Sequence, residues 1–158
     1  GAATEVELKE KKNRVEDALS ATRAAVEEGI VPGGGLALIR ARQSLNELNF
    51  DNDEQTGVNI LKSALVKPLM LISENTGVSG EVILAETLKG DGDYGYDAET
   101  GEYGNLLEKG IMDPAKVTRA AIENASSVAA MVLTTESLIS DIPEPAAAAA
   151  PAMPPMDY

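Results

Sequence analysis

The stretch Gly-Ile-Val-Pro-Gly-Gly-Gly-Leu, residues 29–36, constrains this chain most, because it separates two helical patterns by a run of three glycines. Gly33, Gly34 and Gly35 lack a Cβ atom, so their backbone can adopt positive φ angles and approach a neighbouring group closely. The N–H groups at the start of the following helix can then bind an anion such as a phosphate. A plain turn between two helices is the alternative interpretation.

A long helix is predicted over residues 5–28, ending at Gly29. Val15, Leu19, Thr22 and Val26 fall on one stripe of this helix. Asp17 falls away from this stripe, on a strip that it shares with Ala21 and Ala24. Since those side chains are small, another group can approach the carboxylate closely. A solvated surface acid is the alternative.

Three further helical patterns follow the glycines, over residues 35–48, 54–75 and 79–88. Pro68 lies inside the second of them, where it removes one backbone donor and predicts a kink. With one Phe, four Tyr and no Trp, the core must consist mainly of aliphatic side chains. The chain is therefore predicted to be mainly α, a helical bundle.

Short extended segments interrupt the helices near the C-terminus. Gly and Tyr alternate with acids over residues 90–105, which predicts two short extended arms around a turn at 99–101, as a β-hairpin or a loop. Asp113 and Pro114 are predicted to be the N-cap and first residue of a last helix. The inner face of that helix is predicted to consist of Val117, Ala121, Ala125, Val128 and Val132.

The end of the chain changes character twice. Residues 136–142 are predicted to form a short C-terminal strand without an evident partner. The low-complexity tail, 143–158, is rich in Ala and Pro and is predicted to be disordered.

Composition excludes several kinds of chemistry. The chain has no Cys and no His, which excludes disulfides, a thiol nucleophile, a Ser-His-Asp relay and a Cys/His zinc site. Its 13 Lys and Arg against 26 Asp and Glu give a net charge of −13, which repels nucleic acid. No apolar run is long enough to cross a bilayer, and no leader is evident. We expect the cytoplasm or an organelle interior, with neither nucleic acid nor membrane as partner.

Three separated blocks together resemble one family, the group I chaperonins of the GroEL type. They are RVEDALSATRAAVEEG over residues 14–29 with the glycines at 33–35, GDGDYGYDA over 90–98, and DPAKVTR over 113–119. The resemblance implies the descending helix of the intermediate domain over 1–28, the C-terminal half of the equatorial ATPase domain over 29–142, and the tail over 143–158. Because the chain begins at Gly1 inside a helical pattern, we expect it to be a fragment of such a subunit with an incomplete equatorial bundle.

The resemblance also implies a function. Such subunits form two stacked seven-membered rings, bind a co-chaperonin and unfolded polypeptides, and use ATP with Mg²⁺ and K⁺ to assist folding. The metal-binding residues of the family belong to its N-terminal half, so none is assigned here. The alternative is an isolated helical scaffold or interaction fragment without ATPase activity.

Individual residues match functional positions of the family. Asp17 matches the catalytic aspartate, which activates the water that attacks the γ-phosphate, a task suited to a carboxylate. The positions matching nucleotide contacts are Gly33 and Gly34 at the nucleotide, Asp97, Ala98 and Glu99 beside the adenine, and Ile111 and Asp113 near the ribose. Asp97 stands where the best-known members have Asn, so it lacks an amide donor.

Overall fold

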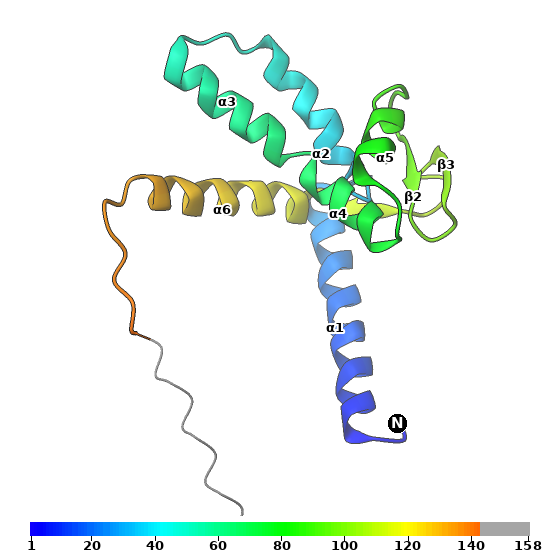
Figure 1. Ribbon diagram of the computed structural model, residues 1–158. Helices are drawn as coiled ribbons and strands as arrows, with labels where there is room; N and C mark the ends of the chain where they lie inside the picture. The colour runs from blue at the N-terminus through cyan, green and yellow to red at the C-terminus, as the bar shows by residue number, and fades with distance from the viewer. Residues whose placement is uncertain (143–158) are drawn as a thin grey trace, which may run out of the picture.

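The computed structural model describes residues 1–142, so the predicted disordered tail lies outside the described residues. The fold is mainly α, as predicted, with two small antiparallel sheets (Figure 1). The helices are α1 (Glu5–Glu28), α2 (Leu36–Ala41), the 3₁₀ helix η1 (Arg42–Glu47), α3 (Asn52–Ala64), α4 (Lys67–Asn75), α5 (Gly80–Thr87) and α6 (Ala115–Leu133). The strands are β1 (Ile30–Pro32), β2 (Tyr94–Asp97), β3 (Glu102–Asn105) and β4 (Met112–Pro114).

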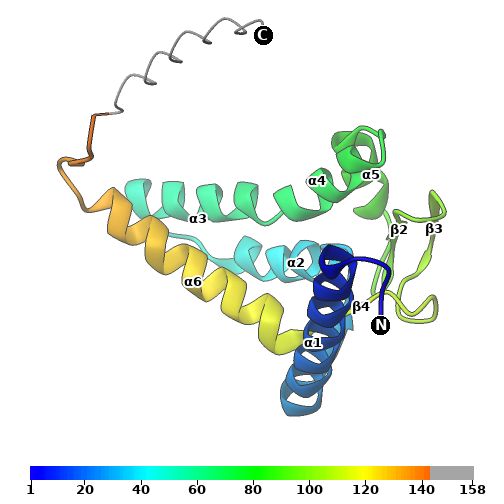
Figure 2. The ribbon, with the colours of Figure 1, turned by 90° about the horizontal axis from the view of Figure 1, so that it is seen from below.

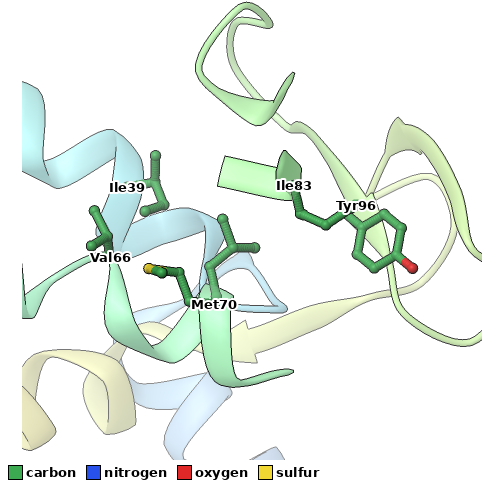
Figure 3. Close-up of a cluster of buried hydrophobic side chains, with 6 residues drawn as sticks. Ile39, Val66, Met70, Ile83 and Tyr96 are labelled. Carbon is green, nitrogen blue, oxygen red and sulfur yellow. The ribbon is translucent and has the colours of Figure 1, made fainter. Parts of the chain in front are cut away.

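One part of the chain, which we call the core region, contains α2, α4, α5 and the β2–β3 hairpin. Buried side chains from α2, the start of α4, α5 and β2 form one cluster (Figure 3). The buried cluster comprises Ile39, Val66, Leu69, Met70, Ile83 and Tyr96. Leu36 and Leu106 are also completely buried, and they lie beside the glycine run. The core region therefore fixes the glycine run on one side.

The other helices, α1, α3 and α6, extend away from the core region in different directions (Figures 1 and 2). We call them the outer helices, and none of them contains a buried residue. The apolar stripe of α1 is open to solvent, since Val15 and Val26 are 68% and 84% exposed. The predicted inward face of α6 is wrong, since Val117 and Val132 are both exposed and no described segment covers them.

Local interactions explain why α1 is helical without burial. The side chain of Thr4 caps its N-terminus by accepting a hydrogen bond from the N–H of Glu7 at 3.2 Å. Ion pairs one turn apart, such as Glu5–Lys9 at 2.8 Å, follow along its surface. Gly29 ends the helix at a φ of 85°, as predicted.

Two predicted helices are shorter in the structure. The segment 35–48 is α-helical only to Ala41, and the 3₁₀ helix η1 follows. Polar side chains there compete with the α-helical hydrogen bonds, as when the Ser44 hydroxyl donates to the Ala41 carbonyl at 2.8 Å. The segment 54–75 is two helices rather than one kinked helix, because Pro68 lies in the first turn of α4 and cannot continue α3.

The predicted hairpin is confirmed by β2 and β3, whose register pairs Tyr96 with Tyr103. Two other predictions near the C-terminus are wrong. Asp113 is not an N-cap, because β4 pairs with β1 and holds this residue in extended backbone, so α6 begins at Ala115. Residues 136–142 form no strand, since the described chain offers them no partner strand and Ile139 is 99% exposed.

Candidate functional site

The β1–β4 ladder brings the glycine run to the segment that contains Ile111 and Asp113. Val31 pairs with Asp113, and the N–H of Gly33 donates to the carbonyl of Ile111 at 3.0 Å. These contacts join positions that are far apart in the sequence. Three of the predicted nucleotide positions, Gly33, Ile111 and Asp113, therefore lie together.

The three glycines of the run have different surroundings, which explain differently why a side chain is absent. A Cβ on Gly33 would lie 3.2 Å from Ile111 Cγ2, and one on Gly35 would lie 2.7 Å from the backbone nitrogen of Leu69. Gly34 has a φ of 64°, and its nearest neighbours lie at 3.8 Å. Packing thus accounts for Gly33 and Gly35. The N–H of Gly33 is already used by Ile111, which leaves less free backbone for an anion than the sequence predicts.

Leu106 connects the hairpin to the glycine run, a role that the sequence analysis did not identify. Its side chain is completely buried, and its Cδ1 lies 3.8 Å from a Cβ built on Gly34. Its backbone accepts from the N–H of Ile111 at 2.8 Å and donates to the carbonyl of Asp93 at 2.9 Å. A signal existed in the sequence, because Leu106 follows a strand pattern directly, but that signal is shared by many ordinary core residues.

The hairpin places its first strand beside Gly34, whose built Cβ lies 3.8 Å from the carbonyl oxygen of Tyr96. The next residues are the predicted adenine positions. Asp97 is only 5% exposed, Ala98 is partly buried against the core, and Glu99 is exposed at the turn. The end of β2 therefore forms a second side of the same site.

The carboxylate of Asp97 is fully engaged in local contacts. Its Oδ1 accepts from the N–H groups of Glu99 at 3.0 Å and Thr100 at 3.4 Å. Its Oδ2 accepts from the Thr100 hydroxyl at 2.7 Å and from Lys109 Nζ at 3.2 Å. The Thr100 hydrogen bond, with help from Lys109 and the two N–H groups, lowers the pKa of Asp97 to about 2. This carboxylate is charged and internally satisfied.

The carboxyl group of Asp113, unlike that of Asp97, has no partner among the described residues that stabilises its charged form. Its side chain is exposed on β4, yet partial desolvation raises the pKa of its carboxyl above the ordinary value. Neither a hydrogen bond nor a nearby cation opposes that shift. A carboxylate in this state is available to accept a hydrogen bond from a ligand hydroxyl.

Asp17 is not brought to these residues. It is exposed on α1, and the remaining length of the helix to Glu28 is about 16 Å at 1.5 Å per residue. Only the C-terminal end of α1 reaches the site, where Glu28 pairs with Arg119 at 2.7 Å and Glu27 pairs with Lys116. These ion pairs hold the end of α1 on the first turns of α6, and the sequence analysis did not predict them.

Within residues 1–142, no group of three or more Asp or Glu side chains is placed to hold a metal ion. In the same range, every helix is too short or too polar to cross a membrane. The site itself presents the Asp113 carboxylate, the apolar side chain of Ile111 and glycine backbone.

Comparison with known proteins agrees with this arrangement. Residues 1–143 match the model of the TCP-1/cpn60 chaperonin family. The fold is similar to a solved structure described as a group III chaperonin in the open state, with a TM-score of 0.76 and 32% sequence identity. That match covers 88% of this chain but only 30% of the solved chain. The chain therefore belongs to the TCP-1/cpn60 chaperonin family.

Proposed function

We propose that this chain is the C-terminal part of a group I chaperonin subunit and supplies one side of its ATP site. The observation that carries the proposal is the meeting of three separate segments: the glycine run, the end of β2, and the segment from Ile111 to Asp113. The subunit would use ATP to assist the folding of unfolded polypeptides within a ring, together with a co-chaperonin.

The residues present fit the nucleoside part of ATP. Asp113 accepts a hydrogen bond from a ribose hydroxyl, because its carboxylate is exposed and has no competing cation. Ile111 and Ala98 offer apolar contacts to the sugar and the base, and Gly34 lets the backbone approach the ligand. This side of the site recognises the nucleoside through shape, one acceptor and bare backbone.

The same residues do not compensate the charge of a triphosphate. Phosphate groups need cations, backbone donors and a metal ligand, and the chain carries a net charge of −13. The residues that hold Mg²⁺ and K⁺ would therefore come from the rest of the subunit. Mg²⁺ would neutralise developing charge on the phosphates when it is bound.

Asp17 is the proposed general base. A carboxylate can orient a water molecule and accept its proton during attack on the γ-phosphate. Because Asp17 lies about 16 Å along α1 from the end of that helix, it acts only if α1 changes its angle to the core region. The ion pairs of Glu27 and Glu28 with α6 would then be the contacts that a rotation of α1 must alter.

A scaffold without catalysis is the second candidate, and one observation favours it. An open apolar groove of about 540 Å³ lies between α3 and α6, and it is lined by residues such as Ile60, Leu61 and Ile122. Such a surface suits protein contact rather than chemistry. Under this candidate the chain contributes helices to an assembly, and nucleotide binding does not depend on its residues.

Calorimetric titration with Mg-ATP separates the two candidates. The 158-residue chain alone should bind weakly, whereas a complete subunit that carries this sequence should bind tightly. In that subunit, Asp113→Ala should weaken binding about tenfold, because a charged hydrogen bond is lost. Asp91→Ala, which changes an exposed acid on a neighbouring loop, is the control. Equal affinities of the complete subunit and its Asp113→Ala and Asp91→Ala variants would support the scaffold.

Hydrolysis tests Asp17 separately. In the complete subunit, Asp17→Ala should leave ATP affinity nearly unchanged and slow hydrolysis roughly 10²-fold or more, as expected for loss of a general base. Glu16→Ala removes another exposed acid from the adjacent position and should hydrolyse ATP at the normal rate. A normal rate in the Asp17 variant would identify Asp17 as a surface acid.

A further inference from the structure

We propose that Lys109 and Asp97 form a positioning pair: Lys109 holds the Asp97 carboxylate, which orders the turn at 98–101 and does not contact the base of a bound nucleotide. The predicted effect on nucleotide binding rests on the proposed function, whereas the pair itself rests on the hydrogen bonds and distances in the structure. It adds Lys109, a residue outside the segments that match the nucleotide contacts, to those that shape the site.

The hydrogen-bonding capacity of Asp97 is the first observation. An ionised carboxylate offers about four lone-pair sites. Four donors already occupy them: the N–H groups of Glu99 and Thr100, the Thr100 hydroxyl, and Lys109 Nζ. Because Asp97 is also only 5% exposed, no acceptor remains for a base. The side chain therefore acts on the turn that follows it.

The path of Lys109 is the second observation. Its side chain crosses the hairpin over Gly104, where an added Cβ would lie 3.1 Å from Lys109 Cε and 3.8 Å from Cδ. Gly104 thus leaves room for the lysine. The side chain is 29% exposed, and its Nζ lies 3.5 Å from the second acid, Glu102, on the solvent side.

The backbone around Lys109 is the third observation. Its N–H donates to the carbonyl of Asn105 at 3.1 Å, and the Asn105 side chain accepts from the N–H of Glu108 at 3.2 Å. This tight turn fixes the start of the lysine side chain relative to β3. The ammonium therefore reaches Asp97 from a turn that is itself held by hydrogen bonds.

The chemistry of position 97 follows from the pair. An Asn at this position could still accept from the turn through its Oδ1, but it would place a neutral amide opposite the ammonium of Lys109. The carboxylate and the lysine therefore suit each other, and a change in one should require a change in the other. If the turn is released, Ala98 and Glu99 lose their fixed position after the end of β2, whose Tyr96 carbonyl lies next to Gly34.

Amide hydrogen exchange tests the pair in the absence of nucleotide. In the 158-residue chain, Asp97→Asn and Lys109→Met should each speed exchange of the Glu99 and Thr100 amides about tenfold. The double variant should exchange no faster than the single variants, because the two residues act as one unit. Lys89→Met, which breaks the exposed pair with Glu86 at 2.6 Å, is the control and should leave these amides unchanged. If the two substitutions speed amide exchange additively, or do not change it, the proposed pair is overturned.

Nucleotide affinity then tests positioning in the complete subunit. Asp97→Asn and Lys109→Met should weaken ATP and GTP by the same factor, about three- to tenfold, and the double variant should recover part of the loss. If Asp97 read the base, its variant alone would change the ratio of ATP to GTP affinity, which would overturn the proposal. Unchanged ATP and GTP affinities in both single variants would also overturn the proposal. If the unaltered subunit binds no ATP, the proposed function fails, and the exchange data alone decide whether the pair exists.

Discussion

The core region and the outer helices differ in what stabilises them. In the core region, Leu36 and Ile39 are completely buried, and Leu69 is 1% exposed. In the outer helices no residue is buried, and α1 depends on its cap, its ion pairs and its contact with α6. The difference teaches that an apolar helical pattern does not ensure burial. The core region has its own partners, whereas the apolar faces of α3 and α6 remain open in the described chain.

The largest expected effect comes from the same substitution made in both regions. Leu36→Ala should lower the free energy of unfolding by about 2–5 kcal/mol, because it leaves a cavity in a packed site. Leu133→Ala changes a side chain that is 81% exposed on α6, so it should change that free energy by less than about 0.5 kcal/mol. Urea unfolding of both variants measures the difference. Similar losses would mean that α6 is packed in solution.

A smaller loss of stability is expected from replacing glycines, and it distinguishes the cost of a close contact from the cost of a left-handed backbone conformation. Gly35 and Gly77 both have positive φ, 79° and 83°, but only Gly35 approaches Leu69, while Gly77 faces open space. Gly77→Ala should cost about 1–2 kcal/mol for the left-handed conformation alone. Gly35→Ala should cost about 1–3 kcal/mol more, because its Cβ overlaps the backbone of α4.

Thermal unfolding of the two glycine variants checks this comparison, and Gly57→Ala is a useful third protein. Gly57 lies inside α3 with no neighbour near its built Cβ, so alanine there should be neutral or stabilising. If Gly35→Ala were no worse than Gly77→Ala, the glycine run would not be packed as tightly as its contacts indicate.

Local signals in the sequence predicted much of the fold. Gly29 ends α1, the glycine run separates two helices, and the Gly/Tyr-rich segment forms a hairpin, because each feature depends on residues that are neighbours in the chain. Pro68 was correctly identified as a disruption, although it separates two helices and does not bend one. Turn and cap chemistry acts over a few residues, which is why it can be read without a structure.

Long-range pairing explains the failures. Asp113-Pro114 has the local chemistry of a helix start, but pairing of Val31 with Asp113 makes it a strand. The periodicity of Val15 correctly indicates an apolar face of α1, yet nothing in the pattern says whether a described segment covers that face. In the same way, nothing in the pattern around Asp97 indicates that Lys109 contacts its carboxylate from across the hairpin.

The smallest predicted effect is the pH dependence of stability that comes from two carboxylates of the site, Asp97 and Asp113. Their contributions to the free energy of unfolding have opposite signs. The pKa of Asp97 is about 2 in the folded chain, below its value near 3.8 when unfolded. Its contribution to stability is therefore complete above about pH 4 and is lost as the pH falls toward about 2. Lys109 stays protonated over that range, because its pairing with Asp97 raises the pKa of its ammonium further.

Asp113 should behave in the opposite way, because desolvation raises its pKa in the folded chain and makes the charged form unfavourable. Asp113→Asn should therefore raise the urea midpoint slightly at pH 7, and the gain should disappear in acid once both states are protonated. Asp97→Asn should lower the midpoint at pH 7, and its difference from the unaltered chain should shrink between about pH 4 and about pH 2. Urea midpoints of the three proteins from about pH 2 to about pH 7 measure both slopes. A stabilising contribution from charged Asp113 would contradict its assignment as the available acceptor, because it would reveal a partner that already satisfies the carboxylate.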